Sequence, residues 1–142
     1  MDAIKEWVNE FQLLGLAVVL GFVQLVWAAL AARRQQGLDW ARGARDEDRP
    51  VTGVAARLER AFRNFMETFP LFAVAVIADI TAEKTSWLTL WGSLIYVAAR
   101  VVYVPLYASG VPGVRSLVWF VSIIGLLMVT AALFLPAGAG AM

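Results

Sequence analysis

Two long stretches of the chain consist almost entirely of apolar residues. Phe11 to Ala32 is a run of 22 residues without a charge, broken only by two glutamines. Ser116 to Pro136 is a second run of 21 residues, rich in Leu, Val and Ile. Because a helix rises about 1.5 Å per residue, about 20 residues cross a hydrocarbon core of about 30 Å. We therefore predict membrane-spanning helices over residues 11–33 and 115–136.

Two further stretches are long enough to span a membrane but carry polar groups. Residues 54–80 are polar in their first half and apolar in their second, and residues 86–108 are mainly apolar, with one arginine and three tyrosines. A short turn follows each of these two stretches, polar after the first and built from Gly and Pro after the second, whereas residues 34–53 form one long charged loop. Short connections favour antiparallel neighbours. The sequence thus predicts a single domain over residues 1–142, an all-α integral membrane protein built as an antiparallel bundle of four transmembrane helices.

The composition agrees with a membrane protein and removes several kinds of chemistry. Of the 142 residues, 61% are hydrophobic and 16% are charged, whereas soluble domains are about 45–50% apolar and about 25% charged. The chain has no cysteine and no histidine. It therefore offers no disulfide, no thiol nucleophile, no histidine base and no Cys/His zinc site. We expect the lipid bilayer as a partner, and neither a metal nor a nucleic acid.

The basic residues are divided unevenly between the two sides of the predicted bundle. Lys5 and Lys84 fall on one side. The other ten basic residues fall on the opposite side: Arg33, Arg34, Arg42, Arg45, Arg49, Arg57, Arg60, Arg63, Arg100 and Arg115. Loops and helix ends rich in Lys and Arg remain in the cytoplasm. We therefore expect the arginine-rich side to be cytoplasmic and both termini to lie outside.

Polar residues near that side recur at helical spacing, so that they share helix faces. They are Arg60, Asn64 and Glu67 in the second predicted helix, Arg100, Tyr103 and Tyr107 in the third, and Arg115 at the start of the fourth. These residues could converge on one pocket between helices. Arginine is suited to carboxylates, and tyrosine hydroxyls are further donors. A ligand with carboxylates, an amino group and amide bonds suits this set.

The same spacing also has a purely structural interpretation. Arg63 lies four residues before Glu67, so the two could form an ion pair on the helix surface. Arg100 could extend its guanidinium to the lipid head groups. Tyr103 and Tyr107 could belong to an interfacial aromatic belt. The spacing alone leaves both interpretations open.

Two motifs resemble those of the MAPEG family, the membrane-associated proteins in eicosanoid and glutathione metabolism. Residues 59–72 match the pattern E-R-x-x-x-N-x-x-E-x-x-P-x-F at every fixed position. The run Arg100-x-x-Tyr103-x-Pro105-x-Tyr107, followed by Pro112-x-x-Arg115-Ser116-x-x-Trp119, is similar to the region of the third and fourth helices in bacterial members. The resemblance covers nearly the whole chain, including the four helices and the long first loop.

The resemblance implies a homotrimer in the bacterial inner membrane that uses glutathione as a co-substrate and holds it between neighbouring protomers near the cytoplasmic face. It implies a transferase or peroxidase in which an arginine stabilises the glutathione thiolate, which then attacks a lipophilic electrophile. Arg115 is the best match to this arginine by position. The residues assigned to glutathione binding are Arg60, Asn64, Glu67, Arg100, Tyr103, Tyr107 and, as a second candidate for the thiolate, Arg34.

Two positions depart from the leukotriene-synthase type of the family. Thr68 follows Glu67 where that type has a tyrosine, and the segment from Tyr107 to Arg115 is one residue longer. The alternative to an enzyme is therefore a membrane protein of MAPEG fold that binds an anionic or lipid-like ligand without catalysis. A small-molecule exporter is a third hypothesis. It would be favoured by an acidic residue in the first apolar stretch, which has none.

Overall fold

The computed structural model describes residues 8–136, and this part of the chain is helical without any strand. Its elements are α2 (Glu10–Gln36), the short α3 (Leu38–Arg42), α4 (Gly53–Thr81), α5 (Trp87–Ser109) and α6 (Val114–Ala132). The four long helices are each long and apolar enough to cross a membrane. The prediction of an all-α integral membrane protein with four transmembrane helices is confirmed.

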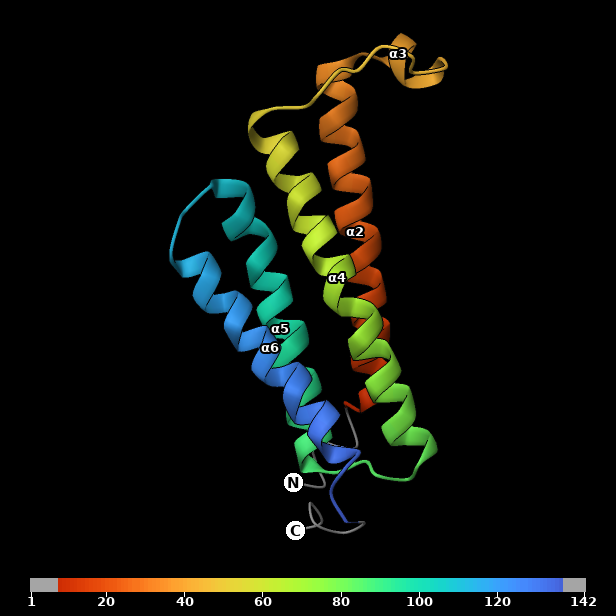
Figure 1. Ribbon diagram of the computed structural model, residues 1–142, viewed down its shortest axis with the longest axis vertical. Coiled ribbons are helices and arrows are strands. Elements are labelled where there is room, and N and C mark those ends of the chain that lie inside the picture. The colour runs from red at the N-terminus through yellow and green to blue at the C-terminus, as the bar shows by residue number, and fades with distance from the viewer. Residues whose placement is uncertain (1–7, 137–142) are drawn as a thin grey trace.

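The helices alternate in direction and pack as two antiparallel pairs (Figure 1). Helix α2 lies against α4, α5 lies against α6, and α4 and α5 join the two pairs. We call the end of the bundle that holds the loop between α2 and α4 and the turn between α5 and α6 the arginine end. The opposite end, which holds the turn between α4 and α5, is the closed end. The arginines of the predicted basic side thus come together at one end of the molecule.

Local signals explain where the helices begin and end. Asn9 and Gln12 form a reciprocal capping box at the start of α2, with distances of 2.9 and 3.0 Å between side-chain oxygens and backbone nitrogens. Ser86 and Thr89 cap α5 in the same way. Gly110 ends α5 in the left-handed conformation (φ 77°), which favours glycine. Helix α6 ends at Ala132, earlier than the apolar run that continues to residue 136.

Close backbone contact holds α5 and α6 together. A Cβ atom on Gly125 would lie 2.6 Å from the carbonyl oxygen of Gly92 and 2.7 Å from the amide nitrogen of Tyr96. No side chain larger than hydrogen fits at this crossing. Small residues of this kind bring transmembrane helices together, because in lipid the packing itself drives their association. Tyr96 then stacks on Phe72 of α4, with ring centroids 4.1 Å apart.

The loop between α2 and α4 was expected to be a solvated surface loop, and its residues are mostly exposed. It is nevertheless held by hydrogen bonds to the end of α2. The Gln36 side chain donates to the carbonyl oxygen of Arg49 (2.7 Å), and Arg49 donates back to that of Gln36 (3.1 Å). Gln35 exchanges two hydrogen bonds of 3.0 Å with the backbone of Thr52. These bonds set where α4 begins.

Candidate functional site

The arginine end is organised around one buried guanidinium. Arg100 of α5 is 1% exposed. Its Nη1 donates to Asn64 Oδ1 and its Nη2 to Thr68 Oγ1, both at 2.7 Å, and both acceptors belong to α4. The guanidinium also lies 5.5 Å from the ring centroid of Tyr96 and 5.4 Å from that of Tyr103. The planar fork of arginine suits this double contact, so Arg100 fixes both α4 side chains relative to α5.

Thr68 extends this network further into the bundle. Its hydroxyl lies 3.0 Å from the Tyr96 hydroxyl, in addition to accepting from Arg100. Thr68 is buried, and it lies one helical turn from Asn64 on the same face of α4. The residue that departs from the leukotriene-synthase type therefore belongs to the packing beneath the site.

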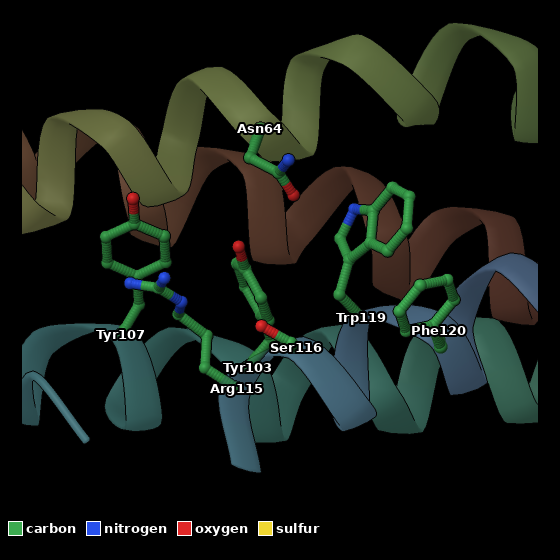
Figure 2. A pocket seen from close by; sticks show the side chains of 7 residues that line it. All are labelled: Asn64, Tyr103, Tyr107, Arg115, Ser116, Trp119 and Phe120. Atoms are coloured by element: carbon green, nitrogen blue, oxygen red, sulfur yellow. The ribbon is translucent and has the colours of Figure 1, made fainter. Parts of the chain in front are cut away.

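A pocket of about 240 Å³ opens above this network, between α4, α5 and α6 (Figure 2). Its lining combines donors with aromatic rings: Asn64, Tyr103, Tyr107, Arg115, Ser116, Trp119 and Phe120. The lining therefore brings hydrogen-bond donors and aromatic rings together around one space.

Arg115 provides the positive charge of this pocket. Its guanidinium carbon lies 4.6 Å from the centroid of the Tyr107 ring, and Figure 2 shows it on the pocket side of α6. Tyr107 in turn meets Tyr103 edge to face, with centroids 5.4 Å apart. The indole Nε1 of Trp119 is buried and has no hydrogen-bond partner in the structure. The pocket thus presents donors without a carboxylate, an arrangement that suits an anionic ligand.

Other predicted site residues lie outside this pocket. Arg60 and Glu67 are exposed on α4, and Arg34 is exposed near the end of α2. Glu67 is connected to the pocket only through Asn64, whose Nδ2 donates to Glu67 Oε2 at 3.3 Å. Within residues 8–136 the one ion pair joins Arg49 and Glu47 in the loop. The ion pairs considered for the α4 surface are therefore not formed within this part of the chain.

The structure brings together four of the eight residues singled out from sequence: Asn64, Tyr103, Tyr107 and Arg115. Arg100 does not line the pocket, because its guanidinium is hydrogen-bonded to Asn64 and Thr68 of α4. Ser116 and Trp119 also line the pocket. They stand in the second sequence motif, which pointed to their segment without assigning them a role. Thr68 and Tyr96 have no sequence signal of their own, because their contact depends on how α4 packs against α5.

A MAPEG family model matches residues 13–135, nearly the whole chain. The chain belongs to the MAPEG family. The family includes glutathione-dependent transferases as well as other members. No curated protein and no solved structure matches this MAPEG chain.

The side chains that line the pocket determine what it can bind. Residues 8–136 contain no group of three or more acidic, histidine or cysteine side chains able to hold a metal ion. The pocket instead offers a guanidinium, hydroxyl groups, an amide and an indole N–H. Such a set can bind carboxylates and stabilise a developing anion.

Proposed function

We propose that this MAPEG protein is a glutathione-dependent membrane enzyme of the transferase or peroxidase type, which acts on lipophilic electrophiles. The observation that carries the proposal is the position of Arg115. Its guanidinium lies in a pocket lined by aromatic rings and hydroxyl groups, at the end of a transmembrane bundle. A guanidinium in such a pocket can stabilise a bound thiolate by its positive charge.

The proposed chemistry is electrostatic. A free thiol has a pKa of about 8.5, so only a few per cent of it is ionised near neutral pH. A guanidinium beside the bound sulfur lowers the pKa of the thiol and raises the fraction present as the nucleophilic thiolate. In this proposal Arg115 stabilises the thiolate, and Asn64, Tyr103 and Tyr107 hold the rest of glutathione. Arg100 keeps Asn64 in place from below.

Exposed charges on α4 support a homotrimer in which glutathione is held between protomers. Arg60, Arg63 and Glu67 are exposed on a helix that crosses the membrane and have no ion-pair partner in residues 8–136. A charge at the centre of a bilayer costs about 2.5–3.5 kcal/mol on insertion scales, so such residues face protein or water. A neighbouring copy would cover them and add Arg60 and Glu67 to the site of the next protomer.

An apolar groove lies beside these charges and supports a lipophilic second substrate. It is formed by α2 and α4 and has a volume of about 490 Å³. Its lining consists of Leu25, Ala28, Ala29, Phe62 and Met66, with Glu59 and Arg63 at one side. In our proposal the groove admits electrophiles from the bilayer, and the arginine end faces the cytoplasm, where glutathione is available.

The decisive experiment is a glutathione titration of the purified protein, followed by the ultraviolet absorbance of the thiolate. Wild type, Arg115→Ala and, as a matched control, Arg42→Ala of the exposed α3 helix are compared. We expect Arg115→Ala to lose the thiolate signal and about 10²-fold in kcat/KM toward a chloronitrobenzene or an organic hydroperoxide. Arg42→Ala should leave both unchanged.

Each outcome of this titration separates the hypotheses. Binding without turnover across a panel of electrophiles would favour the non-catalytic alternative, a MAPEG protein with an anionic or lipid-like ligand. Turnover that survives in Arg115→Ala but disappears in Arg34→Ala would move the thiolate role to Arg34. No binding at millimolar glutathione would end the proposal.

A further inference from the structure

Two acidic side chains are buried at the closed end of the bundle, away from the pocket. Asp79, near the end of α4, has 0% of its surface exposed, and Glu10, at the start of α2, has 8%. Burying an ionised carboxylate is strongly unfavourable unless a positive charge or several hydrogen bonds compensate it. The question is what compensates this pair.

One hydrogen bond reaches the carboxylate of Glu10, and none within residues 8–136 reaches that of Asp79. Glu10 Oε1 accepts a hydrogen bond of 2.6 Å from the hydroxyl of Thr89 on α5. Both carboxylate oxygens of Asp79 are buried and, in the part of the chain that the structure describes, have no hydrogen-bond partner. Leu13, Val76 and Leu90, each within one helical turn of Glu10, Asp79 or Thr89, belong to one buried cluster, so the three polar side chains lie at the same end of the bundle. One turn further along α5, the Ser93 hydroxyl is also fully buried without a partner.

The nearby ammonium group is engaged elsewhere. Lys84 lies in the turn between α4 and α5, and its backbone N–H donates to the carbonyl oxygen of Asp79 at 2.8 Å. Its Nζ, however, donates to the carbonyl oxygens of Leu133 and Leu135, just after α6. The other acid in this turn, Glu83, is exposed to solvent. Among residues 8–136, then, no side-chain cation forms an ion pair with Asp79 or Glu10.

We propose that Asp79, Glu10 and Thr89 together bind one small positive charge, a monovalent metal ion or a proton, inside the closed end of the bundle. Two carboxylates and a hydroxyl provide oxygen ligands from three different helices, α4, α2 and α5. Ca²⁺ takes six to eight oxygen ligands, more than these side chains supply. Because the site lies at the opposite end from Arg115, it does not depend on the proposed glutathione chemistry.

Bound cation should stabilise the folded bundle by mass action. The full chain in nanodiscs is heated at pH 8 and constant ionic strength, with choline chloride replaced stepwise by sodium chloride. In a second series the salt is choline chloride throughout, and the pH is lowered from 8 to 5. We expect the midpoint of unfolding to rise by about 3–6 °C in wild type. Asp79→Asn, which has nearly the same shape, should lose this rise.

The two series distinguish the source of the charge. A rise with sodium assigns the site to a monovalent metal ion, and sodium added to a weakly buffered sample should then displace protons. A rise with acid alone assigns it to a proton. Glu83→Gln is the control, since it removes an exposed acid at the same end and should respond as wild type does.

Equal responses of wild type and Asp79→Asn to both sodium and acid would overturn the proposal. If Asp79→Asn does not fold, Glu10→Gln provides the same comparison, because it removes the second carboxylate and keeps a side chain able to meet Thr89. Glutathione binding, measured in the same samples, should be unchanged in both variants. A failure of glutathione binding in all samples would count against the proposed function alone.

Discussion

The two ends of the bundle are held together in different ways. Toward the closed end, α5 and α6 meet through their backbones, with Gly92 against Gly125, and midway along the bundle Tyr96 stacks on Phe72. At the arginine end, the contacts run through the donors of a guanidinium, because Arg100 joins α5 to two side chains of α4. The pocket lies at the arginine end. Helices joined there by side-chain hydrogen bonds leave room between them, whereas helices in backbone contact do not.

This difference separates stability from chemistry. Close backbone contact tolerates no change of volume, since interiors are packed as densely as organic crystals. A hydrogen-bonded network tolerates changes of side chain more gradually, at a cost for each donor or acceptor left without a partner. The closed end should therefore determine whether the chain folds, and the arginine end should determine what it binds.

Filling the crossing of α5 and α6 should have the largest effect on stability. Gly125→Ala places a Cβ 2.6 Å from one backbone atom and 2.7 Å from another. We expect a loss of about 3 kcal/mol or more in the free energy of unfolding, measured by equilibrium unfolding in a denaturing detergent. The control is Gly15→Ala on α2, where a Cβ meets nothing within 4 Å. There the higher helix propensity of alanine should stabilise by up to about 1 kcal/mol.

At the arginine end the largest effect should come from Arg100→Ala. The change opens a cavity and leaves Asn64 and Thr68 without their buried donor, so we expect a loss of about 2–3 kcal/mol. Glutathione affinity should also fall, because Asn64 is no longer held toward the pocket. Arg33→Ala, which removes an exposed arginine in the last turn of α2, should cost no more than about 1 kcal/mol and leave glutathione affinity unchanged. If both variants behave alike, Arg100 is not the residue that organises this end.

Thr68→Val tests the network more finely, since it removes one hydroxyl and keeps the shape. The Tyr96 hydroxyl and one Arg100 nitrogen then lose their shared partner. We expect a loss of about 1–2 kcal/mol in the free energy of unfolding. Thr81→Val, at the exposed end of the same helix, should cost less than about 0.5 kcal/mol. A similar loss in the two variants would mean that the buried hydroxyl contributes nothing specific.

The sequence predicts the fold well because the membrane makes one requirement dominant. A run such as Phe11 to Ala32 has to form a helix in lipid, where every backbone group needs an internal partner. The site is predicted less completely. Asn64, Tyr103, Tyr107 and Arg115 reach the pocket, whereas Arg60, Glu67 and Arg34 do not, because helical spacing identifies a shared face but not what covers that face.

What the sequence could not predict depends on contacts between helices. Gly92 and Gly125 stand in ordinary apolar runs, and only the crossing of α5 and α6 shows that they touch. Gln24, one of the two glutamines that break the first apolar run, is 2% exposed and faces the interior. We predicted a loop over residues 34–53, but α2 extends to Gln36 and the short α3 follows it. Residues later in the loop stabilise this segment, as in the hydrogen bond from the Gln36 side chain to the carbonyl oxygen of Arg49.

The smallest effects on stability should come from replacing the two cations that cap a helix, one at each end of the bundle. Arg57 Nε donates to the carbonyl oxygen of Ala108 near the end of α5 at 2.8 Å, and Lys84 donates to the carbonyl oxygens of Leu133 and Leu135 after α6. Each places a positive charge at the negative end of another helix, worth about 0.3–1 kcal/mol. We expect Arg57→Gln and Lys84→Gln each to lower the free energy of unfolding by about that amount. Because Arg57 holds the end of α5, the helix that carries Tyr103 and Tyr107 of the pocket, only Arg57→Gln should also weaken glutathione binding. A loss of binding in Lys84→Gln would show that the two ends are coupled.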